Sequence, residues 1–181
     1  VITDNVINVG TSDHALYLHA GYSSADQIPN ISRNVITNPQ GSGIFIRYGY
    51  AGLTIDANTV LVRNNGIESY YSGGVIAVTG NTLENADTSS QYWNKGSGIY
   101  FNSPRANGGP DNAITSVTLQ NNTIKKFGGS AGLYFDGNNQ TITSSITGNT
   151  ITDSDRQGMY INNLQGTSIT GNTVTGSTDA G

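Results

Sequence analysis

The chain has 181 residues, of which only 11% are charged, and its formal net charge is −4. This length suits one domain with a substantial core, and the acidic balance argues against nucleic acid as a general partner. The chain contains no cysteine, which excludes a disulfide framework and a thiolate metal site. No apolar run approaches the ~20 residues of a membrane-spanning helix, so membrane insertion is not expected.

One short phrase recurs along the whole chain, and its clearest copy, at residues 145–152, reads SITGNTIT. An asparagine marks each copy: Asn5, Asn34, Asn58, Asn81, Asn122, Asn149 and Asn172. The intervals between these asparagines are 29, 24, 23, 41, 27 and 23 residues. A period of about 25 residues with one long interval predicts a solenoid that carries one insertion. We interpret the asparagines as scaffold, because asparagine tolerates left-handed turns and stacked amides hydrogen-bond from coil to coil.

A second phrase lies between most copies of the first. It has a small residue, an apolar residue, a mostly aromatic residue and another apolar residue, and it occupies residues 15–18, 43–46, 66–69, 98–101, 132–135 and 158–161. This alternation predicts a short strand whose two apolar side chains point inward and whose middle side chain points outward. We therefore expect two short strands per repeat. Ser69 takes an inward position in the third copy, where we expect local irregularity.

The paired phrases resemble the parallel β-helix repeats of polysaccharide lyases, pectin-degrading hydrolases, alginate epimerases and related surface proteins. The resemblance covers nearly the whole chain and implies an all-β, right-handed parallel β-helix of about seven coils, in a single domain over 1–181. It indicates no particular reaction, because this fold carries enzymes of several kinds and structural adhesins. Both ends read as ordinary coils, so we expect a solenoid that is uncapped, or is part of a longer chain, or stacks on another subunit.

The 41-residue interval between Asn81 and Asn122 contains two expected loop insertions, at about 86–95 and 102–112. The first loop carries Trp93, the only tryptophan of the chain. Loops that project beside a strand of a solenoid commonly carry specificity, so Trp93 is a candidate substrate contact.

Alignment of the second phrases predicts two outward-facing columns of side chains. The first column is Tyr17, Phe45, Glu68, Tyr100, Tyr134 and Tyr160, and the second, two residues further on, is His19, Arg47, Tyr70, Asn102, Asp136 and Asn162. The small residues two positions before the first column predict bare backbone on one side. Together these features predict a shallow groove with an aromatic floor and a polar bank.

Aromatic and amide side chains in such a groove suit a carbohydrate ligand, because they offer apolar surface to sugar rings and hydrogen bonds to hydroxyls. The candidate substrate-binding residues are Phe45, Tyr100, Tyr134, Tyr160, Trp93, Asn102 and Asn162. The alternative is that the aromatic column only stabilises the sheet through cross-strand stacking.

The candidate catalytic residues fall into two groups, each suited to a different reaction. Hydrolysis needs two carboxylates ~5–10 Å apart. Glu68 and Asp136 are the candidates, although Asp136 lies two coils further on, near or beyond that limit, and Asp153 and Asp155 belong to a later loop. Elimination or epimerisation of a uronic acid needs a cation for the substrate carboxylate plus a base and an acid, and Tyr17, His19 and Arg47 supply these groups on consecutive coils. The alternative for Glu68 is a solvated side chain paired with Arg47.

The sequence therefore predicts an extracellular or cell-surface protein that interacts with polysaccharide and forms part of a degrading or modifying enzyme, either a lyase or a glycoside hydrolase. We predict no metal site and no cofactor, with a calcium ion left open. The alternative is a structural or adhesive solenoid that assembles through its ends. A third option, an ice-binding surface, rests on the recurring threonines at Thr59, Thr82, Thr123, Thr150 and Thr173.

Overall fold

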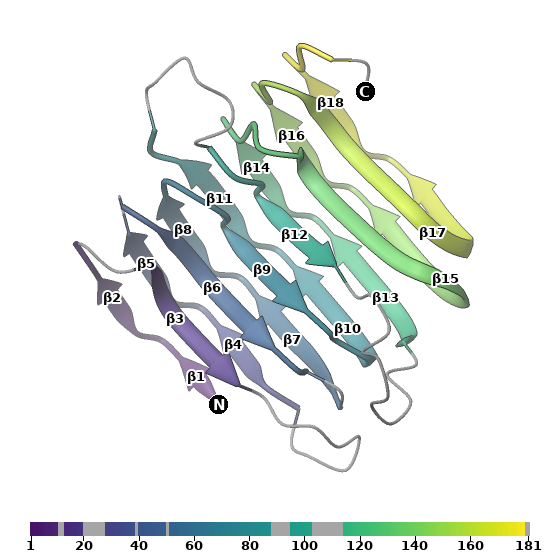
Figure 1. The fold of residues 1–181 in the computed structure, drawn as a ribbon, viewed down its shortest axis with the longest axis horizontal. Helices are drawn as coiled ribbons and strands as arrows, with labels where there is room; N and C mark the ends of the chain where they lie inside the picture. The colour runs from purple at the N-terminus through teal and green to yellow at the C-terminus, as the bar shows by residue number, and fades with distance from the viewer. Residues whose placement is uncertain are drawn as a thin grey trace.

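The computed structural model describes residues 1–10, 13–19, 28–38, 40–49, 51–87, 95–102 and 114–179, without the side chains at 138–142 and 164–165. Regular structure in these residues consists of parallel β-strands that wind into a solenoid (Figure 1). The predicted all-β parallel solenoid is confirmed. The solenoid has about five turns that contact another turn on both sides. This number is slightly lower than the expected seven coils, because each of the two terminal repeats contacts only one other repeat.

Each complete repeat contributes strands to three sheets. The first sheet contains β1 (Ile2–Thr3), β4 (Asn30–Ser32), β7 (Gly52–Asp56), β10 (Gly74–Thr79) and β13 (Ile114–Gln120). The second, seven-stranded sheet contains β2 (Val6–Asn8), β5 (Val35–Asn38), β8 (Thr59–Val62), β11 (Thr82–Asn85), β14 (Thr123–Lys125), β16 (Thr150–Thr152) and β18 (Thr173–Thr175). The sequence suggested two strands per repeat, whereas the structure has three, because the first phrase contains a strand of the first sheet before the asparagine and a strand of the second sheet after it.

The third sheet, called the aromatic sheet below, holds the second phrases. It contains β3 (His14–His19), β6 (Ser42–Arg47), β9 (Ile67–Tyr70), β12 (Ile99–Asn102) and the first parts of β15 (Ala131–Thr147) and β17 (Gln157–Thr170). The later parts of β15 and β17 continue into the first sheet, where β15 pairs with β13. The aromatic sheet is therefore covalently continuous with the first sheet at this end of the solenoid.

The ladder of asparagines occupies the corner between the first and second sheets. In the centre of the ladder, the backbone N–H and the Nδ2 amide of Asn81 both donate to Oδ1 of Asn122 at 3.0 Å. Asn81 also donates to the carbonyl of Ile55 and accepts from Asn58 in turn. The pattern extends from Asn5 to Asn172, and the five asparagines between those two are buried. The scaffold interpretation of the asparagines is confirmed.

The left-handed residue at this corner is the one before each asparagine, not the asparagine itself. Its φ is between 53° and 65° in every repeat, at Asp4, Arg33, Ala57, Gly80, Asn121, Gly148 and Gly171. The left-handed residue turns the chain from the first sheet into the second and leaves the asparagine amide pointing along the solenoid axis.

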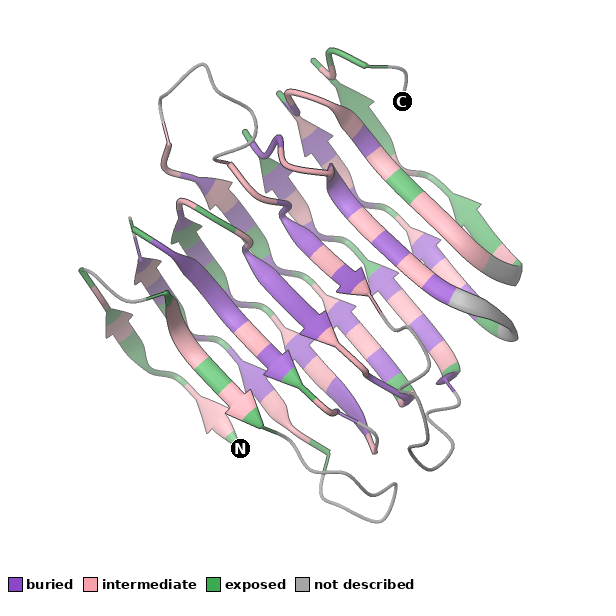
Figure 2. Cartoon of the chain, in the orientation of Figure 1, coloured by how far each residue is buried: buried purple, intermediate pink, exposed green. Residues whose placement is uncertain are grey.

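The core fills the space between the three sheets. Inward apolar side chains such as Ile44, Ile99 and Phe101 are fully buried, and buried positions alternate with partly exposed ones along β12 (Figure 2). Ser69, which takes an inward position, is also fully buried, and its hydroxyl bonds to that of Ser72. The expected irregularity at this repeat is wrong, because β9 pairs in register with both β6 and β12.

The glycines of the second phrase are packing positions and not bare surface. A β-carbon at Gly43 would lie 2.5 Å from Cγ1 of Val60, and one at Gly132 would lie 2.6 Å from Cγ2 of Ile151. In both cases an apolar side chain of the second sheet already occupies the place of the missing β-carbon. The predicted bare side of the groove is therefore wrong. Of the expected loop insertions, residues 88–94 and 103–113 lie outside the described residues.

We predict that Asn81→Ala lowers the free energy of unfolding by about 3 kcal/mol, because the change leaves several buried donors and acceptors of neighbouring repeats unpaired, at ~1–3 kcal/mol each. Chemical denaturation monitored by circular dichroism measures this change. The matched control is Asn172→Ala, a partly exposed member of the same ladder, for which we expect less than half the loss. Equal losses at the two positions would contradict a dominant role for burial.

Candidate functional site

The outward face of the aromatic sheet carries both predicted columns in the predicted register. Tyr17 pairs with Phe45, Phe45 with Glu68, and Glu68 with Tyr100, which is followed by Tyr134 and Tyr160. The second column also pairs as predicted, in the order His19, Arg47, Tyr70, Asn102, Asp136 and Asn162. The placement of these residues is confirmed, while their roles remain predictions.

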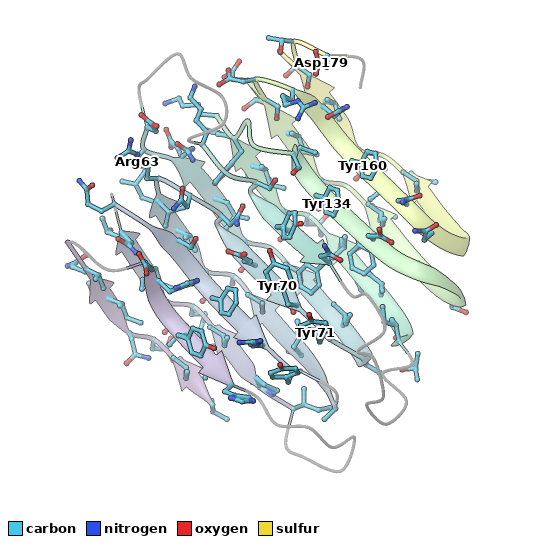
Figure 3. The ribbon with its side chains drawn as sticks, in the orientation of Figure 1. Arg63, Tyr70, Tyr71, Tyr134, Tyr160 and Asp179 are labelled. Atoms are coloured by element: carbon cyan, nitrogen blue, oxygen red, sulfur yellow. The ribbon has the colours of Figure 1, made fainter. Side chains whose placement is uncertain are left out.

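The aromatic rings form a continuous ladder, although Glu68 interrupts the first column. Tyr100 stacks on Tyr134 with ring centroids 4.8 Å apart, and Tyr134 stacks on Tyr160 at 5.1 Å. At the level of Glu68, Tyr70 of the second column fills the gap, with its ring 5.8 Å from Phe45 and 5.7 Å from Tyr100. Figure 3 shows Tyr70, Tyr134 and Tyr160 along this face. The sequence alignment gave no sign that Tyr70 joins the ladder.

Stacking determines which part of each ring is available to a ligand. The planes of Tyr134 and Tyr160 differ by only 6°, and those of Tyr100 and Tyr134 by 15°. Faces engaged in this way are closed to sugar rings along most of the ladder, so the rings present their outer edges and hydroxyls. Tyr17 is 50% exposed and Tyr160 39%. The ladder therefore presents a tyrosine hydroxyl on each strand except β6, where Phe45 has none, at the strand spacing of about 4.8 Å.

Some residues of the second column form hydrogen bonds with neighbouring side chains. Nδ2 of Asn102 donates to the Tyr100 hydroxyl at 3.3 Å, and Nδ2 of Asn163 donates to Oδ1 of Asp136 at 2.8 Å. These contacts orient amide and carboxylate groups at the surface without burying them. The polar bank predicted from the sequence therefore exists along the C-terminal half of the ladder.

Tyr17, His19 and Arg47 come together at the N-terminal end of the ladder. A hydrogen bond with the Tyr17 hydroxyl raises the pKa of Arg47 above its usual value, so the guanidinium is a permanent cation. The same guanidinium lies 4.9 Å from the ring centroid of Tyr48, and the His19 ring lies 5.0 Å from that ring. The structure therefore assembles the three groups proposed for elimination, with Tyr48 as a support that the sequence did not indicate.

Glu68 does not belong to this cluster. Its side chain is buried, at 8% exposure, and Nδ2 of Asn65 donates to its Oε2 at 2.8 Å. Burial, followed by the negative charge of Glu68, raises the pKa of the neighbouring Tyr70 hydroxyl far above its usual range. Among the ion pairs of the described residues, none joins Glu68 to Arg47. The alternative of a solvated Glu68 paired with Arg47 is therefore wrong.

The two carboxylates considered for hydrolysis lie apart. Glu68 is on β9 and Asp136 on β15, with β12 between them, which separates them by ~10 Å along the axis. Glu68 also contacts Asn65 on one side of the ladder, whereas Asp136 belongs to the column on the other side. This arrangement does not favour a paired-carboxylate reaction at these two residues.

A polar pocket of about 430 Å³ lies beside the ladder at Glu68. Its lining consists of Asp13, His14, Ser42, Asn64, Asn65, Glu68 and Gly96. The His14 ring packs against Phe45 with centroids 4.4 Å apart, which connects the pocket to the aromatic ladder. The sequence did not reveal this pocket, because its residues lie at or just before the beginnings of β3, β6, β9 and β12, in four different repeats.

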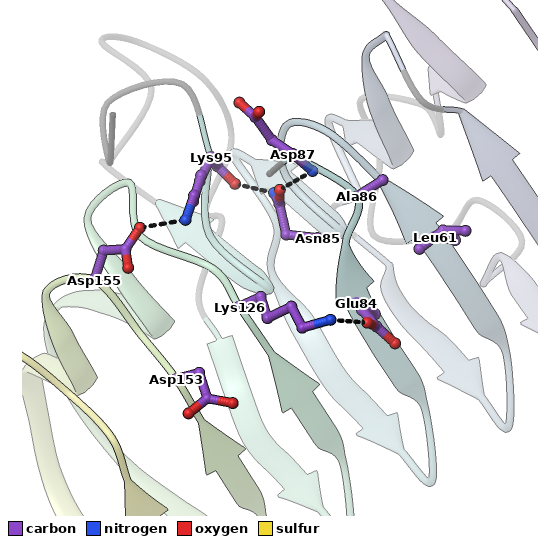
Figure 4. Close-up of a pocket in the computed structure, with 9 residues that line it drawn as sticks. All are labelled: Leu61, Glu84, Asn85, Ala86, Asp87, Lys95, Lys126, Asp153 and Asp155. Carbon is purple, nitrogen blue, oxygen red and sulfur yellow. Dashed lines mark hydrogen bonds and ion pairs between the residues drawn. The ribbon is translucent and has the colours of Figure 1, made fainter. Parts of the chain in front are cut away.

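A second cleft, of about 540 Å³, lies beneath the start of the 86–95 segment (Figure 4). Ion pairs engage both of its lysines: Lys126 pairs with Glu84 at 2.7 Å, and Lys95 pairs with Asp155 at 2.6 Å, while Asp87 and Asp153 leave the lining acidic overall. These pairs connect different turns and so serve the scaffold. We therefore place the candidate site on the aromatic sheet and in the pocket at Glu68.

Trp93 lies outside the described residues, and the described part of the chain contains no group of three His, Cys, Asp or Glu side chains that could hold a metal ion. The same part contains no helix long and apolar enough to cross a membrane. The chain matches no known family, no curated protein and no solved structure.

We predict that stability falls as the pH rises above about 10, the usual pKa of tyrosine. Burial raises the pKa of Tyr70 and of Tyr134, so the folded state keeps both protons where the unfolded chain releases them, and unfolding becomes more favourable with pH. Thermal unfolding between about pH 8 and about pH 11 measures the effect. Tyr70→Phe should reduce the pH dependence, and an unchanged dependence would contradict this assignment.

Proposed function

We propose that the protein binds an extended polysaccharide along its aromatic sheet, outside the cell, and modifies or cleaves that polymer. The observation that carries the proposal is the repetition of the surface. Aromatic rings from six strands, five of them tyrosines with a hydroxyl and one the phenylalanine Phe45, recur with the second column at the strand spacing over about 24 Å. A periodic row of donors and acceptors is suited to a linear polymer, because each repeat of the ligand can make a similar set of hydrogen bonds.

Elimination is the reaction that the arrangement of side chains supports best. Arg47 carries a permanent positive charge at the surface and is suited to neutralise a uronate carboxylate, which acidifies the adjacent C5 proton. The Tyr17 hydroxyl beside it and the nearby His19 ring are candidates for proton removal and for donation to the leaving oxygen. Hydrolysis receives less support, because Glu68 and Asp136 do not face one another.

Binding is tested with neutral, acidic and amino-sugar oligosaccharides of increasing length, by titration calorimetry. We expect affinity to rise with length until the ladder is covered, and Tyr134→Phe to weaken binding about fivefold, because it removes a hydroxyl and leaves the ring stack in place. Thr150→Val, on the second sheet, removes a hydroxyl away from the ladder and should leave affinity unchanged. Length-independent binding, or equal effects of the two changes, would argue against a polymer on this face.

The reaction is tested by mass spectrometry of products from a panel of uronate-containing polysaccharides. We expect unsaturated fragments from the wild-type protein and none from Arg47→Ala, because the substrate carboxylate then has no cation. The control is Arg33→Ala, which removes an exposed arginine paired with Asp4 on another face and should retain activity. Water-added fragments would instead indicate hydrolysis, and oligosaccharide binding without any product would indicate a non-catalytic adhesive solenoid.

A further inference from the structure

Glu68 is a buried carboxylate that forms no ion pair with another described residue. Its two hydrogen-bonding neighbours, the Asn65 amide and the Tyr70 hydroxyl, are both neutral groups. Removal of a carboxylate from water is costly when no opposite charge compensates it, so a cation bound beside Glu68 would reduce that cost.

The pocket beside Glu68 is suited to supply the missing charge from a ligand. Its described lining contains no lysine or arginine; His14 is its one basic side chain, and Asp13 adds a second carboxylate at its edge. The remaining polar lining, which includes Ser42 and two asparagines, offers hydrogen bonds to hydroxyl groups. The pocket therefore favours a cationic ligand that also carries hydroxyls, and it disfavours an anionic one.

The size of the pocket favours an organic cation over a metal ion. Its volume of about 430 Å³ lies in the ~300–1,000 Å³ range of small-molecule sites. The described residues provide no cluster of three acidic, histidine or cysteine side chains for a metal. Phe45 pairs with Glu68 in register, and an aromatic ring next to a carboxylate is a favourable setting for an ammonium group.

We propose that this pocket binds the primary ammonium group of an amino sugar, with Glu68 and Asp13 as its charge partners. The proposal rests on the proposed function, because the amino sugar would be one unit of the polysaccharide on the aromatic sheet. Along β6, Ser42 of the pocket and Arg47 of the elimination cluster lie on opposite sides of Phe45. One polymer with amino and acidic sugars can therefore place opposite charges at the two sites.

The test compares glucosamine oligosaccharides with N-acetylglucosamine oligosaccharides of the same length, at low salt, by titration calorimetry. We expect the wild-type protein to bind the free amine at least tenfold more tightly, which corresponds to about 1.4 kcal/mol. Glu68→Gln keeps the shape of the side chain and removes its charge, so it should abolish the preference for the amine. Glu84→Gln changes a partly exposed glutamate of the second sheet, and this control should retain the preference.

Asp13→Asn provides a second variant at the exposed edge of the pocket, so the proposal stays testable if Glu68→Gln does not fold. It should reduce the preference for the amine several-fold. Equal affinity of the wild-type protein for amine and acetylated oligosaccharides would overturn the ammonium site and leave polysaccharide binding intact. Failure to bind any oligosaccharide would overturn the proposed function itself. Competition by calcium chloride at matched ionic strength, lost in Glu68→Gln, would assign the pocket to a metal ion and overturn the proposal.

Discussion

The buried asparagine ladder is the interaction on which the rest of the structure depends. Each amide bonds to the next at the strand spacing, so every repeat must align at the same position or leave buried donors and acceptors unpaired. Side chains alternate between the two faces of a strand. The alignment at the corner therefore determines which side chains of the following strands face outward. The ladder is unaffected by the length of the intervening chain: the bonds that join Asn81 to Asn122 across 41 residues match those across shorter intervals.

The candidate site is a consequence of the same alignment. Repeats that stack in register place one aromatic residue above another, and stacking then closes most ring faces and turns the hydroxyl edges outward. A surface made in this way is periodic because the fold is periodic. Its exceptions are therefore informative: Glu68 is the one charged residue of the first column, and Arg47 is the one arginine or lysine of the second.

Periodicity explains what could be predicted from the sequence. The outward columns follow from the alignment of repeats, and every pairing from Tyr17 to Tyr160 agrees with it. The first and second sheets could not be separated in the sequence, because one phrase contains a strand of each: residues 145–147 end β15 and residues 150–152 form β16. The left-handed corner carries no consistent signal either, because residues as different as Asp4 and Ala57 adopt it. The direction of a side chain, such as that of Tyr70 toward the aromatic ladder, depends on residues of other repeats. These neighbours are far apart in the sequence, so the sequence alone does not show their contacts.

Glu68 illustrates how an exception to a repeating pattern bears on function. An aromatic side chain at this position would continue the first column between Phe45 and Tyr100 and would be compatible with burial. The carboxylate instead places a charge in a buried position, and Tyr70 fills the gap that it leaves in the ring stack. Local features that reduce stability without a compensating contact tend to occur at functional sites. The uncompensated charge therefore favours a ligand role for Glu68 over a structural one, and its burial beside a polar pocket favours binding of a cation over reaction at the open face.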